Sequence, residues 1–133
     1  MGKFFTIEEL CRSEKASELG IDNTPDTFAE RNMEYLITNL LDPLREAYGK
    51  PITVTSGFRC KELNRAVKGT NGSQHMKGEA ADITAHSCER NKRIFKLIQS
   101  LGLEFDQLID EKNYKWIHVS LTKGSNRKQI LHL

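Results

Sequence analysis

One acidic residue constrains this sequence more than any other. Asp82 lies inside the apolar run 80–84, whose β-branched and small residues predict a strand. An ionised carboxylate is costly to bury unless a positive group or a metal ion compensates it. The fold must therefore bring a partner to this strand.

Two histidines are the candidate partners of Asp82. His75 precedes it by seven positions in a loop, and His118 lies in the middle of a second predicted strand. Two imidazoles and one carboxylate form the ligand set of a catalytic zinc site with one position open for water, which suits amide hydrolysis. Spacing alone leaves an alternative open: a surface His75, a strand-end Asp82 and an unrelated His118.

Composition excludes several classes of function. The 133 residues contain 20 Lys and Arg against 18 Asp and Glu, a net charge of +2, which argues against a nucleic-acid partner. No window approaches the ~18 apolar residues of a membrane span. The first nine residues meet charge too early for a secretory signal, so we expect synthesis in the cytoplasm. We also expect a monomer.

Local patterns predict an α+β fold with helices packed on a small, mainly antiparallel sheet. Capping residues and periodicity predict helices over 6–19, 24–48, 61–67 and 87–102, with a kink or break near Asp42 caused by Pro43. The predicted strands are 52–55, 80–84, 105–109 and 116–121, the last two forming a hairpin. We expect one domain over 1–133, with its core at about 25–121 and a polar, partly loose tail at 122–133.

The three cysteines indicate free thiols. Cys11, Cys60 and Cys88 are odd in number, far apart and without a Cys-x-x-Cys pair. Neither a disulfide framework nor a cysteine zinc site is expected. We expect buried or half-buried thiols in a reducing compartment.

Residues 73–82 carry a resemblance to a known family. Their pattern Ser-x-His-x-x-Gly-x-Ala-x-Asp resembles the signature of the zinc D-Ala-D-Ala peptidases, which include carboxypeptidases, dipeptidases and phage endolysins that cleave peptidoglycan. The segment 56–59, Ser-Gly-Phe-Arg, and the hairpin 105–121 are similar to further parts of that family. The resemblance covers about residues 25–121 and is strongest to compact bacterial and prophage members, with a hedgehog-like fold.

The resemblance implies a role for several residues. It assigns the zinc ligands to His75, Asp82 and His118. It implies that Arg59 binds a substrate carboxylate or steadies the developing oxyanion, tasks that suit a planar, permanently charged guanidinium.

Three further residues are candidate substrate-binding groups. Ser73 and Gln74 either bind substrate, orient His75 or serve as turn residues. Trp116 is either part of the core or a wall of the substrate cleft.

The general base is the point at which the sequence departs from the family. Several members place Glu or Asp three residues before the last histidine, where this chain has Lys115. We take Glu111 as the candidate base, with Asp106 and Asp110 as alternatives. Strand alternation places residues 106, 108 and 110 on one face and 107, 109 and 111 on the other, so only one set faces the zinc.

These observations predict a zinc metallopeptidase that hydrolyses peptidoglycan stem or cross-link peptides, as a D-Ala-D-Ala carboxypeptidase or an endolysin-like endopeptidase. Such an enzyme acts at the cell wall after phage-type release or delivery. Two alternatives share the fold: a non-catalytic zinc-binding module, as in hedgehog signalling domains, and a phage structural component.

Overall fold

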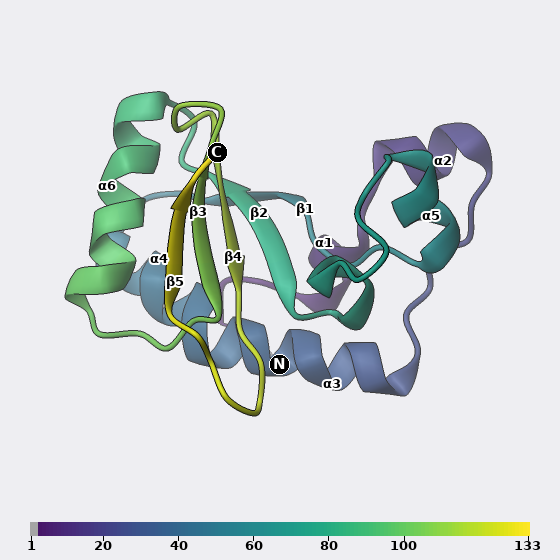
Figure 1. The fold of residues 1–133 in the computed structure, drawn as a ribbon, viewed down its shortest axis with the longest axis horizontal. Coiled ribbons are helices and arrows are strands. Elements are labelled where there is room, and N and C mark those ends of the chain that lie inside the picture. Colours follow the sequence, from purple (N-terminus) through teal and green to yellow (C-terminus); the bar gives the residue numbers. More distant parts are fainter. Residues whose placement is uncertain (1–2) are drawn as a thin grey trace.

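The computed structural model describes residues 3–133; the first two residues of the segment searched for an export signal lie outside it. The chain forms an α+β fold with a single five-stranded sheet (Figure 1). The strands are β1 (Thr53–Ser56), β2 (Ala80–Thr84), β3 (Gln107–Glu111), β4 (Trp116–Ser120) and β5 (Gln129–His132). Their order is β1-β2-β4-β3-β5, and only β3 and β5 pair in parallel. The predicted fold class is confirmed.

The helices lie mostly in the first half of the chain and between β2 and β3. They are α1 (Ile7–Cys11), α2 (Glu14–Leu19), α3 (Thr27–Leu36), the π-helical turn η1 (Ile37–Leu41), α4 (Asp42–Tyr48), α5 (Lys61–Ala66), the 3₁₀ turn η2 (Gln74–Lys77) and α6 (Cys88–Ser100). α3, η1 and α4 follow one another without a loop.

The single helix predicted over 6–19 is wrong. The chain leaves the helix at Arg12, and Ser13 adopts an extended backbone between α1 and α2. The Ser13 hydroxyl accepts a hydrogen bond from the Ala16 N–H at 3.1 Å. A serine that caps a new helix in this way competes with continuation of the first one.

The predicted irregularity at Pro43 takes the form of a π-helical turn. The backbone N–H of Asp42 donates to the carbonyl of Ile37, five residues earlier, and α4 begins at Asp42. Proline lacks an N–H and its ring meets the carbonyl four residues before it in a regular helix. A wider turn just before Pro43 relieves that conflict.

One face of the sheet packs on the helices and forms the core. Side chains of β2, β3 and β4 meet those of α3, η1, α4 and α6 there; the buried members include Met33, Leu36, Leu40, Leu44, Ile83, Ile94, Ile98, Leu108, Ile117 and Val119. Strand alternation turns the intervening residues to the opposite face. Asp82, His118 and Ile109 share that second face because each stands opposite the next in the pairing of β2, β4 and β3.

The tail at 122–133, expected to be polar and partly loose, contains a strand that the sequence did not predict. Residues Gln129–His132 pair with β3 as the edge strand β5. Arg127 anchors the segment: its Nε and a terminal nitrogen donate to the Asp106 carboxylate at 3.0 and 2.8 Å, and its backbone N–H donates at 2.9 Å. Its polar composition concealed this strand, because edge strands commonly carry charged residues.

The predicted β3–β4 hairpin is confirmed, with a two-residue shift of its first strand. β3 spans Gln107–Glu111 instead of 105–109. Three consecutive turn residues, Lys112, Asn113 and Tyr114, have positive φ. The Tyr114 N–H donates to the Asp110 carboxylate at 2.6 Å, which fixes the turn.

All three cysteines are free thiols. Cys11 and Cys60 are half-buried as expected, whereas Cys88 is exposed at the first position of α6. Burial raises the pKa of Cys11 to about 11, so its thiol stays protonated at neutral pH. Within residues 3–133, no helix has the length and apolar character that crossing a bilayer requires.

Replacement of Asp106 by Asn tests the anchoring of the C-terminal segment. The hydrogen bonds from Arg127 lower the pKa of Asp106 to about 2, despite partial burial, which acts in the opposite direction. Because the folded pKa is depressed, the stabilisation is complete above about pH 4 and is lost as the pH falls toward 2. We expect Asp106→Asn to lower the free energy of unfolding by about 2 kcal/mol at pH 7 and by progressively less at lower pH.

Urea unfolding at pH 7, 5 and 3 measures this difference. Glu89→Gln is the matched control, since it removes only an exposed pair with Arg93 and costs less than about 0.5 kcal/mol. A cost for Asp106→Asn that does not change with pH would contradict the expectation.

Candidate metal centre

A short 3₁₀ turn presents His75 to the sheet. The Ser73 hydroxyl accepts a hydrogen bond from the His75 N–H at 3.2 Å, and Gly78 ends the turn with a positive φ of 75°. A Cβ at Gly78 would lie 2.4 Å from the Ala29 carbonyl oxygen, so glycine is required both for the backbone angle and for the contact with α3. His75 is thereby only 3% exposed.

A backbone carbonyl fixes the ring of His75. Nδ1 lies 2.7 Å from the carbonyl oxygen of Gly57, and a carbonyl only accepts, so Nδ1 carries the proton. The other nitrogen, Nε2, is then the one with a free lone pair, and it lies 3.5 Å from Oδ1 of Asp82. This is the tautomer of a histidine that binds metal through Nε2.

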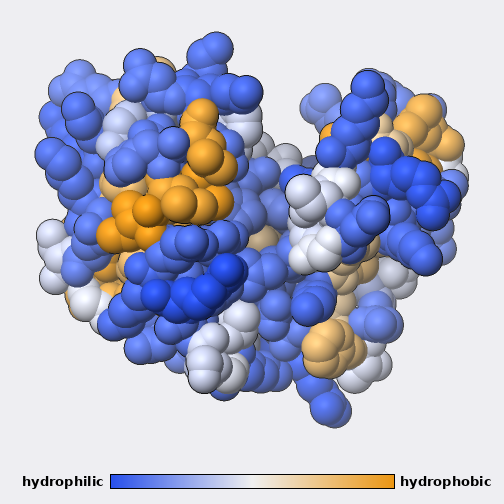
Figure 2. Space-filling model, viewed as in Figure 1, coloured by the Kyte–Doolittle hydropathy of each residue, from blue (hydrophilic) through white to orange (hydrophobic). Residues whose placement is uncertain are grey.

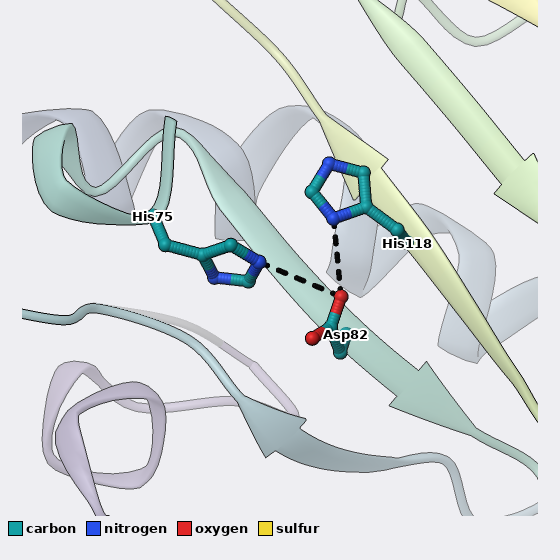
Figure 3. A group of neighbouring side chains, drawn as sticks. All are labelled: His75, Asp82 and His118. Atoms are coloured by element: carbon teal, nitrogen blue, oxygen red, sulfur yellow. Dashed lines mark hydrogen bonds and ion pairs between the residues drawn. The ribbon is translucent and has the colours of Figure 1, made fainter. Parts of the chain in front are cut away.

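Strand pairing supplies the other two members of the cluster (Figure 3). Asp82 on β2 stands directly opposite His118 on β4, and Nδ1 of His118 lies 3.1 Å from Oδ1 of Asp82. The rings of His75 and His118 are 5.1 Å apart between centroids. One ligand atom from each of the three residues lies within 4.8 Å of the others.

The cluster holds Asp82 in its charged form. Burial alone would raise the pKa of this carboxyl group, whose side chain is 13% exposed. The interactions with His118 and His75 outweigh that effect and hold the pKa well below its usual range. A charged carboxylate beside two imidazoles is the state in which these residues bind a divalent cation.

The donor set fits zinc. Two imidazole nitrogens and one carboxylate oxygen are ligands that zinc takes at about 2 Å, and three protein ligands leave a position for water. His75 also has the hydrogen-bonded carbonyl that commonly orients a metal-binding histidine. The residues present therefore suit a mononuclear zinc site with three protein ligands.

Arg59 lies beside this cluster. A terminal nitrogen of its guanidinium is 3.7 Å from Oδ2 of Asp82, and its Nε donates to the hydroxyl of Ser56 at 3.2 Å. Its backbone N–H donates to the His75 carbonyl at 3.1 Å. Burial lowers the pKa of Arg59 and the neighbouring Asp82 opposes this, but an arginine remains charged at pH 7 in either case.

Helix α1 packs behind the segment that orients His75. The Phe58 N–H donates to the Leu10 carbonyl at 2.8 Å, and a Cβ at Gly57 would lie 2.2 Å from that same carbonyl oxygen. Only glycine lets the two backbones approach this closely. The carbonyl that accepts from His75 is thus held against α1.

The candidate substrate-binding residues fall into two groups. The side chains of Ser73 and Gln74 make contacts within the protein: Ser73 caps η2, and the amide Nε2 of Gln74 donates to Asp106 at 2.9 Å. These contacts favour the orienting role for both. Trp116 is half-exposed on the same sheet face as His118, two residues along β4, which favours the cleft wall over the core.

The structure separates the three candidate bases. Glu111 stands opposite Trp116 in the sheet, so it shares the face of His118 and is half-exposed. Asp110 points to the other face, where it pairs with His132 at 2.9 Å. Asp106 forms an ion pair with Arg127. Of the three, Glu111 is the carboxylate that lies on the metal-ligand face and takes part in neither ion pair.

A groove adjoins the cluster on the side of β1. It has a volume of about 650 Å³ and lies between the segment of α1 and α2 on one side and β1 and α5 on the other. Arg59 and Ser56 form the part of its wall that reaches Asp82. Figure 2 shows the surface hollowed and mainly hydrophilic between the part that carries the sheet and the part that carries α2 and α5.

Sequence reasoning did not identify the groups that support the site. The Gly57 carbonyl is a backbone group, which no residue type reveals. Asn64, which accepts from Arg59, and Arg127, which binds Asp106, stand outside the recognised pattern. His86 and His132 lie away from the cluster and contact Thr53 and Asp110.

The cluster of His75, Asp82 and His118 could hold a zinc ion, and comparison with known proteins gives the family. The family described as Peptidase M15 matches residues 3–120, most of the chain. The chain belongs to this family, which confirms the resemblance found in the sequence.

A curated relative is similar to part of the chain. The protein named zinc D-Ala-D-Ala carboxypeptidase from Streptomyces albus G is 50% identical over 48 residues. These residues make up 35% of this chain and 19% of the relative, so the match spans about a fifth of that protein.

Zinc binding to the purified protein tests the cluster. We expect one zinc ion per chain and a loss of affinity of at least about 100-fold in His118→Ala, because a ligand is removed. His86→Ala is the control, since His86 lies outside the cluster, and it should bind like the parent. Isothermal titration calorimetry measures both; equal affinities of His118→Ala and the parent would contradict the assignment.

Proposed function

We propose that this protein is a zinc metallopeptidase that hydrolyses the peptides of peptidoglycan. The observation that carries the proposal is the cluster of His75, Asp82 and His118 on the open sheet face, with Arg59 beside it, in a chain of the M15 family. The name of the Streptomyces relative supports D-Ala-D-Ala peptides as the substrate class. The resemblance to prophage members supports an endolysin-like endopeptidase as the second form of the same activity.

The three ligands would hold the zinc ion, which when bound lowers the pKa of a water molecule and polarises the carbonyl of the scissile bond. The chain must still supply a group that accepts a proton from the water and returns it to the leaving amine. Glu111 is suited to this because it lies on the ligand face and is not bound by Arg127 or His132. Lys115, in the turn before β4, is exposed, and an ammonium group has no lone pair with which to accept a proton, so it does not suit the same role.

Arg59 would bind the negative group of the substrate. Its guanidinium is fixed by Ser56 and lies near Asp82, so its position is set before substrate arrives. A free C-terminal carboxylate or a developing oxyanion is the group that such a fork binds best.

The groove beside β1 would hold the rest of the peptide. Arg59 lies at the junction of the groove and the metal centre, so a substrate anchored there extends along β1. One wall of the groove carries positive and negative side chains: the basic ones are Arg12 and Lys15, and the acidic ones are Glu9 and Glu14. Stem peptides of peptidoglycan carry both carboxylates and amines, which such a surface accommodates.

The cellular site of action is part of the proposal. Peptidoglycan lies outside the cytoplasmic membrane, so the enzyme would reach its substrate by phage-type release or delivery and act there as a monomer.

Glu111→Gln tests the assignment of the base. The substitution keeps the size of the side chain and removes its proton-accepting charge, so we expect kcat on a D-Ala-D-Ala peptide to fall by about 100-fold or more with zinc binding unchanged. Glu89→Gln, on the exposed face of α6, is the matched control and should keep full activity. Release of D-alanine measures the exopeptidase reaction, and cleavage of cross-linked dimers measures the endopeptidase reaction.

One outcome would overturn this function, and another would overturn only the assignment of the base. A zinc-loaded parent that cleaves neither substrate would favour a non-catalytic zinc-binding module or a phage structural component. Full activity in Glu111→Gln would remove Glu111 from the mechanism and leave the peptidase assignment in place.

A further inference from the structure

Asn64 is a buried polar side chain that the reaction described above does not use. It lies on α5 and is only 3% exposed. Its Oδ1 accepts a hydrogen bond from a terminal nitrogen of Arg59 at 3.1 Å, and its Nδ2 donates to the Thr70 carbonyl at 2.9 Å. The two ends of one amide thus connect the guanidinium to the loop that precedes His75.

Gly69, in the loop that precedes His75, packs against the contact between Asn64 and Arg59. Its N–H donates to the Asn64 carbonyl at 2.8 Å. A Cβ at this glycine would lie 2.2 Å from Oδ1 of Asn64 and 2.8 Å from the nearer terminal nitrogen of Arg59. Gly69 is outside the left-handed region, so the requirement for glycine here is one of space.

The contact completes the set of groups that fix the guanidinium. Ser56 binds Nε, Asp82 lies 3.7 Å from one terminal nitrogen, and Asn64 accepts from the other. An arginine fork held at all three nitrogens has little freedom to rotate. Without Asn64 one nitrogen would lose its partner in a half-buried place, and the guanidinium would be free to swing toward Asp82.

We propose that Asn64 is the positioning residue of Arg59, and that Gly69 is required because its missing side chain leaves room for the amide–guanidinium contact. Asn64 acts through Arg59 and does not touch the metal ligands. The part of this inference that concerns substrate rests on the proposed function, whereas the part that concerns the orientation of Arg59 does not.

The first experiment measures the guanidinium directly. In zinc-loaded protein labelled with ¹⁵N-arginine, the exchange rate of the Arg59 Nε proton with water reports how firmly the side chain is held. We expect Asn64→Leu and Gly69→Ala to raise this rate about fivefold to tenfold, the equivalent of one net hydrogen bond. Gly72→Ala is the matched control in the same loop, since a Cβ there meets nothing within 4 Å.

A conservative variant keeps the test decisive if Gly69→Ala fails to fold. Asn64→Asp retains an acceptor for Arg59 and loses the donor to Thr70, so we expect its exchange rate to stay closer to the parent than that of Asn64→Leu. An unchanged exchange rate in folded, zinc-binding Asn64→Leu would overturn the proposal, whatever the enzyme cleaves.

The second experiment asks whether Asn64 acts through Arg59 in catalysis. We expect Asn64→Leu to lower kcat/KM about 10-fold to 100-fold on a peptide with a free C-terminal carboxylate, with less effect on its C-terminal amide and unchanged zinc affinity. In Arg59→Lys the further loss from Asn64→Leu should nearly vanish, because the two residues act as a unit. Additive losses would overturn the coupling, and a parent inactive on both peptides would refute the proposed function while the exchange measurement still decides the positioning role.

Discussion

The antiparallel pairing of β2 with β4 is the interaction on which the rest of the site depends. It sets Asp82 directly opposite His118, so two of the three ligands come together through backbone hydrogen bonds and need no loop to align them. A shift of one residue in either strand would turn its ligand into the apolar core, away from the other ligand. The core face, formed by Ile83, Ile117 and Val119, therefore fixes the register that the metal centre needs. Stability and chemistry are specified by the same two strands, on opposite faces.

His75 needs more support than the other two ligands because it lies in a turn and not in a strand. η2 is held from two sides: on one, the Gly57 carbonyl accepts from the His75 ring; on the other, Gln74 reaches Asp106, which Arg127 holds in turn. The C-terminal segment thus contributes to the site without facing it. Support of this kind is what keeps a metal-binding histidine in one tautomer and one orientation. It also explains why polar residues with no catalytic role are buried near the cluster.

The cluster of His75, Asp82 and His118 could be anticipated from the sequence because a carboxylate in an apolar strand must be paired and because the pattern at 73–82 resembles that of a known family. The α+β class followed from periodicity. What could not be predicted depends on contacts distant in sequence. Ser13 ends one helix by capping the next, β5 forms because β3 offers an open edge, and Asn64 matters only because the fold brings Arg59 to it. The sequence could not show whether Glu111 or Asp110 lies on the face of His118, because alternation alone does not fix the register of β3.

The close approach of α1 to Gly57 has a consequence for which parts of the chain belong to the metal centre. Leu10 is far from every ligand in sequence, yet its carbonyl binds the N–H of Phe58 and abuts Gly57, whose own carbonyl fixes the His75 ring. The backbone at Gly57 and Phe58 therefore connects the N-terminal helix to the His75 ring. Removal of α1 would leave all three ligands in the chain and still loosen one of them, so the smallest fragment that binds zinc well has to begin before Ile7.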